Sequence, residues 1–513
     1  MTYLNSTEIM QLHGYPLYMT DMVDACLRAR LNLFFIGDTG SGKTQLVHEF
    51  MHYFGDKTMF LLGRNDMDTR ELFQQINLGK LYTKPSYNIE PLVNPDSGDV
   101  EWYYPQISTG GGIIPTKLTK VQAQRVRTTL DNLLGTTADV KELTSRIKTQ
   151  LFAVDELPNC MPAVRSQLFN LFDGFMEING RAYPIGDDGQ LVARKGSDFK
   201  ILPAGTATAT IGTLRAGGYE IRNAAYAVGI ATGNLGQQFT ESSNDLGRAL
   251  KDRMHVTMDF DYFFPKASDT YEILSENTNP RVNFGIENPV KPLDIVTLHQ
   301  TFLSRPVDTD KLFVACYLVH GLDSCNNGMS KRKMKDRWPN DVTPADDDAA
   351  DPTTPTAPAT PAAPKGKKGK KDHGKGSDEF LIFPLSMRAA KSVIRLSQAL
   401  DMIVEEKAQK AGTTATIDYI DSMLHAYKFV AAYSGVLNEA AVDQKYGGDN
   451  YKALDAVIQS TQAQFQSQEQ NILAGTDMIR NKKIDQRVLD LFKGRWEYMR
   501  DVFKHLTHLN AQQ

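Results

Sequence analysis

The sequence is poor in cysteine and contains no long apolar run. Its 4 cysteines among 513 residues are scattered, without a C-x-x-C pair, so the sequence predicts neither a disulfide framework nor a zinc site. No apolar stretch is long enough to span a bilayer, and the segment Met1 to Leu12 is too polar for a signal peptide. We therefore expect a cytoplasmic protein that does not insert into a membrane.

Neither sign of charge dominates the sequence. The 57 Lys and Arg residues are offset by 61 Asp and Glu residues, which leaves a net charge of -4. This balance gives no global signal for nucleic-acid binding, and the sequence also lacks a helix-turn-helix or zinc-binding signature. Composition alone therefore does not favour nucleic acid as the partner.

One short stretch organises the rest of the chain. The apolar run Leu33 to Ile36 is followed directly by G-x-x-x-x-G-K-T and then by a helical pattern, which is the arrangement of a phosphate-binding loop. Glycines let backbone N–H groups surround a polyphosphate, Lys43 can reach the terminal phosphates, and the Thr44 hydroxyl can hold magnesium. A chance glycine-rich turn is the alternative. The predicted nucleotide-binding residues are Gly37, Asp38, Thr39, Gly40, Ser41, Gly42, Lys43, Thr44 and Gln45.

Acids and an amide follow two further apolar runs. Leu151 to Val154 lead into Asp155 and Glu156, as expected of a buried parallel strand that delivers carboxylates to the edge where α/β sheets bind ligands. Asp155 is the predicted magnesium residue, and Glu156 the predicted base on the attacking water. A second buried strand, Ala225 to Thr232, is followed by Asn234, whose amide can bind the same water. The alternative for the two acids is a strand that ends in a helix-capping residue.

The length of the chain exceeds what one hydrophobic core usually supports, so we expect about two to four structural units. Composition predicts long loops at 80–115, a helical stretch from Lys117 to Lys148, and a β-rich segment at 176–223. A segment rich in Pro and Lys, 340–378, is predicted to be disordered. Three helices are predicted near the end of the chain, at Ile417 to Leu437, Tyr451 to Ile479 and Ile484 to Leu506.

In this order, the phosphate loop, Asp155-Glu156, Asn234 and Asp252-Arg253 resemble the AAA+ ATPases, in particular the MoxR and dynein-related (AAA_5) branch. The resemblance covers about residues 10 to 265, with longer loops than compact members have. Four further segments contribute to it: the helix Pro162 to Gln167, the turn Asn179-Gly180, the strand Ala231 to Asn234 and the segment Leu250 to Met254.

The resemblance implies an α/β fold, with a three-layer αβα nucleotide-binding core built on a parallel sheet. An all-helical lid and a helical C-terminal region would follow the core. The expected boundaries are 1–265 for the core with its β insertion near 176–223, 266–410 for the lid with the disordered loop 340–378, and 411–513 for the C-terminal region.

The resemblance also implies a ring, most often a hexamer, in which an arginine of one subunit reaches the nucleotide of its neighbour. By position this arginine is Arg253, and Arg248 is the reserve. The segment Leu385 to Lys391 is similar to the family's S-x-R-A segment. Its arginine, here Arg388, would contact nucleotide phosphate as a second sensor. A solvated helix face is the alternative for the first two arginines, and a surface position is the alternative for the third.

The function that the resemblance implies is magnesium-dependent hydrolysis of ATP by a homo-hexameric ring that remodels or activates a separate protein client, such as a protein with a von Willebrand A domain. A nucleic-acid motor or loader is the alternative, and it would use the β insertion and the lysine-rich loop. A second alternative is a structural ring that nucleotide only stabilises, against which Lys43, Asp155, Glu156 and Asn234 argue. A small-molecule kinase would not need all of these residues together with an arginine acting in trans.

Overall fold

The computed structural model describes residues 7–64, 74–76, 91–93, 100–107, 113–125, 141–143, 148–160, 162–178, 181–186, 191–195, 198–202, 208–223, 226–234, 247–275, 295–325, 328–334, 337–339 and 380–512. The chain forms two compact units. The larger unit combines residues 1–67 with residues 149–513, and the smaller one consists of residues 68–148.

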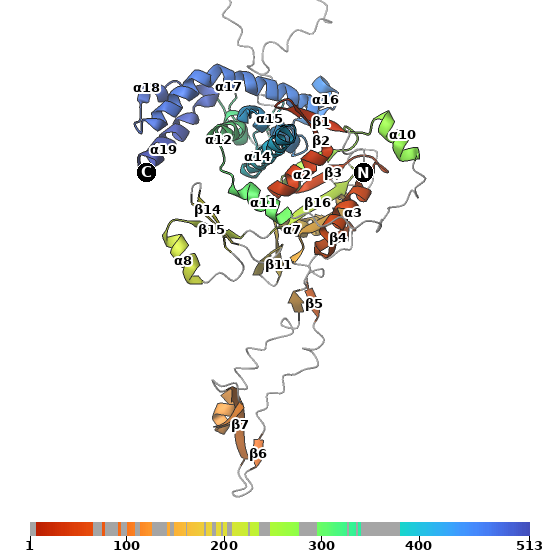
Figure 1. Cartoon of the computed structure of the whole chain (residues 1–513), viewed down its shortest axis with the longest axis vertical. Coiled ribbons are helices and arrows are strands. Elements are labelled where there is room, and N and C mark those ends of the chain that lie inside the picture. Colours follow the sequence, from red (N-terminus) through yellow and green to blue (C-terminus); the bar gives the residue numbers. More distant parts are fainter. Residues whose placement is uncertain are drawn as a thin grey trace, which may run out of the picture. The chain divides into compact units, whose positions relative to one another are not determined.

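A five-stranded parallel sheet forms the centre of the larger unit, with the strand order β17-β3-β16-β10-β4 (Figure 1). Every residue of its three inner strands is buried, as expected where helices cover both faces of a parallel sheet. The predicted α/β core is thereby confirmed. The strands are β3 (Leu33–Ile36), β4 (Thr58–Leu62), β10 (Leu151–Asp155), β16 (Val228–Gly233) and β17 (Val256–Asp259).

Short helices and hairpins connect and flank these strands. A hairpin of β1 (Glu8–Leu12) and β2 (Tyr15–Tyr18) precedes the sheet. The flanking helices are α2 (Met19–Ala29), α3 (Lys43–Phe54), α7 (Pro162–Phe172), α9 (Gly247–Lys251) and α10 (Ala267–Ser275), with the short turns η1 (Gly55–Lys57) and η4 (Leu157–Asn159).

The segment predicted to be rich in β structure contains a hairpin and a three-stranded sheet. The hairpin pairs β11 (Phe175–Ile178) with β12 (Arg181–Pro184). The sheet has the order β14-β13-β15, built from β13 (Leu191–Lys195), β14 (Asp198–Leu202) and β15 (Glu220–Asn223). One helix that the sequence did not predict, α8 (Thr208–Ala216), lies between the last two strands in sequence. The predicted turn Asn179-Gly180 lies outside the described residues.

The region after the sheet is helical in its described residues. The elements are α11 (Ile295–Ser304), α12 (Thr309–Cys316), η6 (Tyr317–Gly321), α13 (Lys331–Met334), α14 (Met387–Lys410), α15 (Tyr419–Ala431), α16 (Glu439–Tyr446), α17 (Asn450–Arg480), α18 (Gln486–Leu489), η9 (Gly494–Trp496) and α19 (Met499–Gln512). Among the described residues, no helix is long and apolar enough to cross a membrane. The predicted disordered segment 340–378 lies outside them.

The prediction of one helix from Ile484 to Leu506 was wrong. The chain there forms α18, η9 and α19, because Gly494 adopts a left-handed conformation with φ 60° that interrupts a helix. The guanidinium of Arg500 then donates to the carbonyl groups of Leu489 and Phe492, at 3.1 and 2.7 Å. The apolar spacing that suggested one helix instead arises from the way these short elements pack.

The smaller unit contains β strands where the sequence predicted loops and a helix. β7 (Val100–Ile107) pairs with β6 (Pro91–Val93) and β8 (Ile113–Leu118), and β5 (Gln74–Ile76) pairs with β9 (Lys141–Leu143). The prediction of loops at 80–115 was therefore wrong over β6, β7 and the first residues of β8. Within the predicted helix from Lys117 to Lys148, residues 120–125 are helical, whereas β8 extends to Leu118 and β9 contradicts the helix farther on. The aromatic and branched residues of β7 favour a strand even beside Pro and Gly.

Candidate functional site

The phosphate-binding loop lies between β3 and α3, as the motif predicts. Gly37 has a φ of 146°, and a Cβ atom there would lie 3.0 Å from the Cβ of Phe260 and 3.1 Å from a carboxylate oxygen of Asp261. Gly42 precedes α3 with a φ of 85°. Only glycine adopts such positive φ angles without strain, and only glycine leaves the space that a Cβ atom at position 37 would fill. The N-terminus of the 12-residue helix α3 therefore points its free N–H groups into the loop.

The Lys43 ammonium lies inside this loop, where only 8% of the residue is exposed. It donates hydrogen bonds to the carbonyl oxygens of Gly37 and Asp38, at 2.9 and 2.7 Å, and to the Ser41 hydroxyl at 3.0 Å. Burial lowers the pKa of Lys43, and the nearby carboxylates, with Asp261 foremost, oppose this shift. The loop thus holds a cation at its centre with all three of its donors directed at oxygen atoms.

Thr44 and Asp155 come together beside the loop. The Thr44 hydroxyl donates to the Asp155 carboxylate, with its two oxygens at 3.2 and 3.1 Å. Asp155 is the last residue of β10 and is 6% exposed. A hydroxyl and a carboxylate next to a phosphate cradle form the donor set that suits Mg²⁺, which takes one or two protein oxygens together with substrate phosphates. The predicted metal residues therefore lie where such an ion could be held.

Thr232 joins the two acids of the site. Its hydroxyl donates to the carboxylate of Asp155 and accepts a hydrogen bond from the backbone N–H of Glu156, at 3.0 Å. Thr232 is 2% exposed and lies on β16, next to β10 in the sheet. The sequence analysis gave this residue no role. Its position beside Asp155 on a neighbouring parallel strand is the signal that could have identified it.

Glu156 has a left-handed backbone, with φ 56° and ψ 43°, which is uncommon for a residue other than glycine. The Glu156 side chain is exposed, and the Asn159 amide donates to its carboxylate at 2.6 Å. Asn234 directly follows β16, which lies between β3 and β10. The parallel sheet thus brings the loop, Asp155, Glu156 and Asn234 to one edge.

The loop is also tied to the end of β17. The Asp38 N–H donates to the Asp261 carboxylate at 2.8 Å, and the Asp261 N–H donates to the Asp259 carboxylate at 2.9 Å. The hydroxyl of Tyr433, which follows α15, donates to the other oxygen of Asp259. Burial raises the pKa of Tyr433, so this hydroxyl keeps its proton. The sequence analysis did not identify this link from the helical region to the phosphate-binding loop.

Arg253 lies at the opposite edge of the sheet. It precedes β17, and its carbonyl accepts a hydrogen bond at 3.0 Å from Asn32, the residue before β3. Its guanidinium donates to Asp173 at 2.9 Å. Arg388, at the start of α14, forms an ion pair with the same carboxylate at 3.2 Å. The two predicted nucleotide-contacting arginines therefore lie together, but away from the loop of their own chain.

Arg248, the second candidate for the arginine that acts in trans, packs against the helical region. Its guanidinium lies 4.8 Å from the ring centroid of Phe383. Burial lowers the pKa of Arg248, and Asp252 opposes this shift. The roles predicted for all three arginines remain predictions. Gln45, in the first turn of α3, donates to Glu49 at 3.2 Å.

Comparison with known proteins gives one family match. Residues 32–99 match the family described as AAA domain (dynein-related subfamily), a range that includes the phosphate-binding loop and ends before Asp155. Comparison with curated proteins finds no match. A crystal structure of a candidate ATPase from Cytophaga hutchinsonii aligns with 86% of this chain and over 88% of its own, at 11% sequence identity and a TM-score of 0.45. The family match, the parallel sheet and the helices that follow it fit an α/β core of the AAA+ type followed by a helical region.

Proposed function

We propose that this protein is a magnesium-dependent ATPase that works as a homo-hexameric ring and remodels a separate protein client. The observation that carries the proposal is the connected set Thr44, Asp155, Thr232 and Glu156, which lies directly beside the phosphate-binding loop. A loop that only binds nucleotide would need Lys43 and Thr44, but it would not need a second acid held in a constrained turn.

Each residue of the predicted site has one role in the proposed reaction. Lys43 would exchange the carbonyl oxygens of the loop for phosphate oxygens, and Thr44 and Asp155 would hold magnesium, whose charge would offset that of the phosphates. Glu156 accepts the proton of the attacking water, and Asn234 orients that water. Thr232 fixes the two acids relative to each other.

The ring is supported by the separation of Arg253 from its own loop. The loop follows β3 and Arg253 lies beside the residue that precedes β3. A strand of four residues spans about 13 Å, so this arginine cannot reach nucleotide bound to the same chain. A second copy of the chain could place the sheet edge that carries Arg253 against the sheet edge that carries the phosphate-binding loop of the first copy. When such head-to-tail contacts repeat and close, they give a ring.

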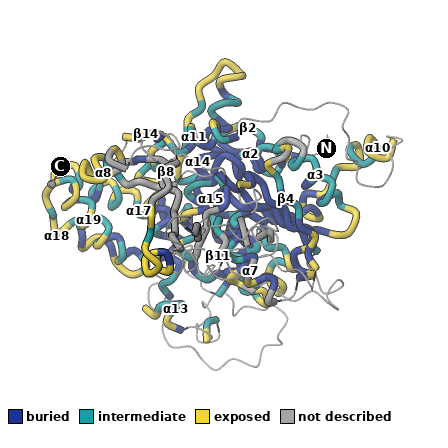
Figure 2. Tube along the Cα trace, turned by 90° about the horizontal axis from the view of Figure 1, so that it is seen from below, coloured by how far each residue is buried: buried dark blue, intermediate teal, exposed yellow. Residues whose placement is uncertain are grey.

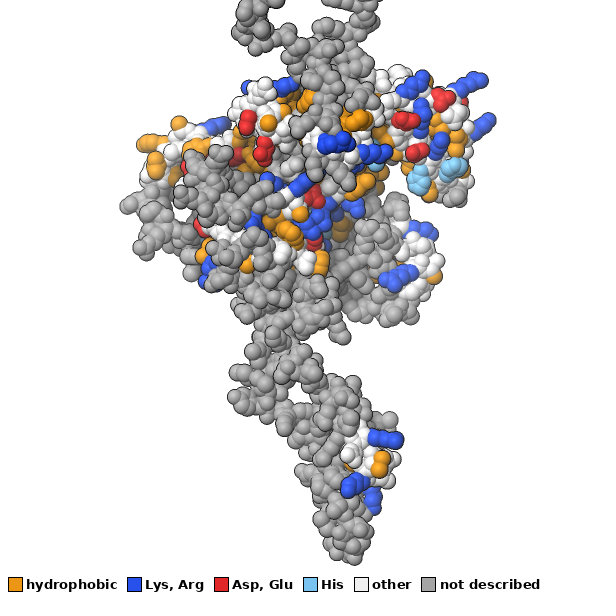
Figure 3. Space-filling view, turned by 180° about the vertical axis from the view of Figure 1, so that it is seen from behind, with side chains coloured by type: hydrophobic (Ala, Val, Ile, Leu, Met, Phe, Trp, Pro, Cys, Tyr) orange, Lys and Arg blue, Asp and Glu red, His pale blue; other side chains and the backbone are white. Residues whose placement is uncertain are grey.

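A protein client is favoured over nucleic acid by the charge of the chain. The net charge is -4, and the described Lys and Arg side chains that gather near the centre of the face in Figure 3 have Asp and Glu side chains among them. Nucleic-acid binding without base contacts depends on a continuous positive surface. The nucleic-acid motor remains the alternative function.

The replacement of Glu156 by Gln tests the mechanism. We expect Glu156→Gln to retain ATP binding and to lower the rate of hydrolysis about 100-fold or more, because the base is lost while the loop stays intact. Lys43→Ala is the control, which should lose binding as well. Unchanged hydrolysis by Glu156→Gln would overturn the mechanism.

The same variant can identify the client, because it should hold ATP and stay in the client-bound state. Affinity purification of Glu156→Gln with ATP, compared with Lys43→Ala, should enrich a protein. Enrichment of nucleic acid instead would favour the alternative function.

A further inference from the structure

Two arginines and two aspartates form a chain of ion pairs, Arg253–Asp173–Arg388–Asp252, at the sheet edge opposite the phosphate-binding loop. Asp173 accepts from Arg253 at 2.9 Å with one oxygen and pairs with Arg388 at 3.2 Å with the other. Arg388 also donates to Asp252 at 3.3 Å. The second oxygen of Asp252 accepts at 2.6 Å from Ser386, whose hydroxyl caps α14. The network therefore joins the end of α7, the end of α9 and the start of α14.

The guanidinium of Arg253 is held on several sides. Besides its bond to Asp173, it donates to the carbonyl of Ala249 at 2.8 Å and lies 4.8 Å from the ring centroid of Phe169. Its side chain is 18% exposed. A long side chain would otherwise sample many rotamers. These contacts fix Arg253 in one direction, and Asp173 supplies the only carboxylate that it contacts among the described residues.

Asp173 also neutralises the repulsion between the two arginines. Each of its oxygens engages a different guanidinium, so the carboxylate bridges them. Without this charge, two cations would lie side by side, and like charges at close range disfavour one another. The side chain of Arg388 is 39% exposed, so solvent would let it move away from Arg253. The loss of Asp173 would thus change the direction of both arginines.

We propose that Asp173 is the positioning residue that holds Arg253 for its approach to the neighbouring subunit, and that Arg388 makes this position depend on the lid helix α14. The inference rests on the proposed function, because it requires that Arg253 acts in trans. Asp173 itself touches no nucleotide: it lies at the edge of the sheet away from the loop of its own chain, and it acts through the arginines.

The test uses the full-length protein with Asp173→Asn, which removes the charge and keeps the shape. We expect the kcat for ATP hydrolysis to fall about 10- to 100-fold, as for other residues that orient a reacting group, with the KM for ATP nearly unchanged. Asp173→Glu, which restores the charge, should have a kcat between those of Asp173→Asn and the unmodified protein. Asp477→Asn is the matched control, since it removes the carboxylate of an exposed ion pair with Arg480 and should leave kcat unchanged.

Mixing experiments separate a positioning role from a structural one. Subunits with Lys43→Ala bind no ATP but carry an intact Asp173 and Arg253, so their addition to Asp173→Asn subunits should restore part of the activity. An unchanged kcat in Asp173→Asn, or an equal loss in kcat and affinity without recovery on mixing, would overturn the inference. If Asp173→Asn does not fold, Asp173→Glu subunits are mixed with Lys43→Ala subunits instead. Partial recovery of activity would support the positioning role, and no recovery would overturn it.

Failure of the proposed function has a different signature. Mixing Arg253→Ala with Lys43→Ala should also restore part of the activity, because each subunit supplies what its neighbour lacks. If that mixture stays inactive, the trans action of Arg253 is wrong. If it recovers while Asp173→Asn alone has full activity, only the positioning role of Asp173 is wrong.

Discussion

At the scale of single residues, Thr232 connects the two acids of the site. Its hydroxyl contacts both the Asp155 carboxylate and the Glu156 backbone. Because Thr232 is 2% exposed, water cannot easily replace these bonds, and a buried polar group that loses its partner costs about 1–3 kcal/mol. The Asp155 carboxylate and the Glu156 backbone thus share one neutral partner.

We expect Thr232→Val to lower ATP hydrolysis about 10- to 100-fold, in the range of other groups that orient the ligands of a metal. Valine has nearly the same shape, so the sheet should be retained and only the two hydrogen bonds lost. Thr232→Ser keeps the hydroxyl and is the control, with activity close to that of the unmodified protein. Equal activities of the Val and Ser variants in a steady-state ATPase assay would contradict this role.

The sequence predicted the residues of the site that lie in local motifs and missed those that depend on long-range contacts. The phosphate-binding loop and the acids after β10 follow from short patterns, and parallel pairing then brings them to one edge. Asp173, Thr232 and Asp261 each have a partner 76 to 223 residues away in the chain. No local pattern specifies such contacts, because they depend on how the strands and helices are arranged in space.

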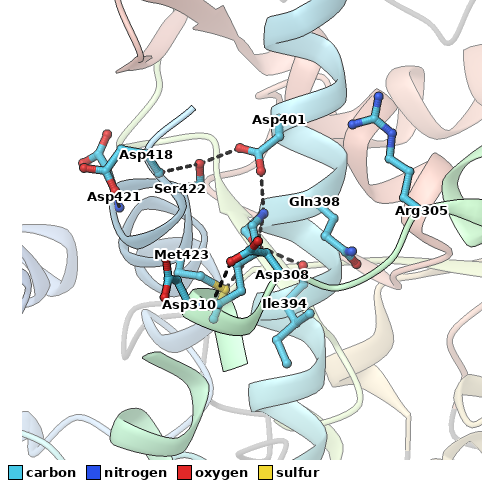
Figure 4. A network of polar contacts seen from close by, with 12 residues as sticks. Arg305, Asp308, Asp310, Ile394, Gln398, Asp401, Asp418, Asp421, Ser422 and Met423 are labelled. Atoms are coloured by element: carbon cyan, nitrogen blue, oxygen red, sulfur yellow. Dashed lines mark hydrogen bonds and ion pairs between the residues drawn. The ribbon is translucent and has the colours of Figure 1, made fainter. Parts of the chain in front are cut away.

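At the scale of elements, the helical region is built around a buried charge. Lys311 of α12 is 1% exposed, and its ammonium donates to Asp401 and to Ser397 of α14, at 2.5 and 3.0 Å. Ser422 of α15 donates to the other oxygen of Asp401 (Figure 4). Burial lowers the pKa of Lys311, and Asp401 opposes the shift. Three helices thus share one ion pair, and His13 from the β1–β2 turn contacts Ser422 at 2.8 Å.

We expect Asp401→Leu to lower the free energy of unfolding by about 3–5 kcal/mol, because it leaves the Lys311 charge buried without a counter-ion. The double variant Lys311→Met with Asp401→Leu should recover most of this loss, since no charge then remains buried. Urea denaturation measures both.

Asp455→Leu is the control for this comparison. Asp455 pairs with Lys428 in the same region, but its side chain is 47% exposed, so its loss should cost at most about 1 kcal/mol. The buried pair would not have the proposed role if the double variant were no more stable than Asp401→Leu alone.

Elements with a clear period and a cap could be predicted, whereas those set by tertiary context could not. α17 was predicted almost to its ends, because Asp449 caps it and its apolar spacing is regular. The strand β7 was missed because its Pro and Gly neighbours are typical of loops, yet it pairs on both sides. Pairing with neighbouring strands gives the backbone N–H and C=O groups of β7 hydrogen-bond partners that lie elsewhere in the chain, so the local sequence does not reveal them.

At the scale of the molecule, one apolar cluster connects the sheet with the helices of the larger unit. It includes Leu33 of β3, Val256 of β17, Val393 of α14 and Phe503 of α19, all with 0% exposure. Figure 2 shows the buried residues gathered around α2, α14 and α15. A shared core predicts that the sheet and the helical region unfold together, although the sequence suggested separate boundaries at 265 and 410.

The pH dependence of this common unfolding step should report on His299. This histidine of α11 is 3% exposed, and its Nδ1 donates to the carbonyl of Arg28 on α2 at 2.6 Å. Burial lowers the pKa of His299 to about 3, opposed by the Arg28 hydrogen bond and reinforced by Arg395 and Arg30. The folded protein therefore keeps the ring neutral, whereas the unfolded chain takes up a proton near its ordinary pKa of about 6.5.

The sign of the effect follows from this difference in proton uptake. The stability that neutral His299 contributes is fully present above pH 6.5 and is lost as the pH falls from about 6.5 toward about 3. Between pH 7.5 and pH 5 this should lower the free energy of unfolding by roughly 2 kcal/mol. His299→Gln can still donate to the Arg28 carbonyl but does not titrate. The fall in its unfolding free energy over the same pH range should therefore be smaller than that of the unmodified protein by roughly 2 kcal/mol. Urea denaturation of both proteins at pH 7.5 and pH 5 measures the difference, and parallel losses of stability would mean that His299 is not the titrating group.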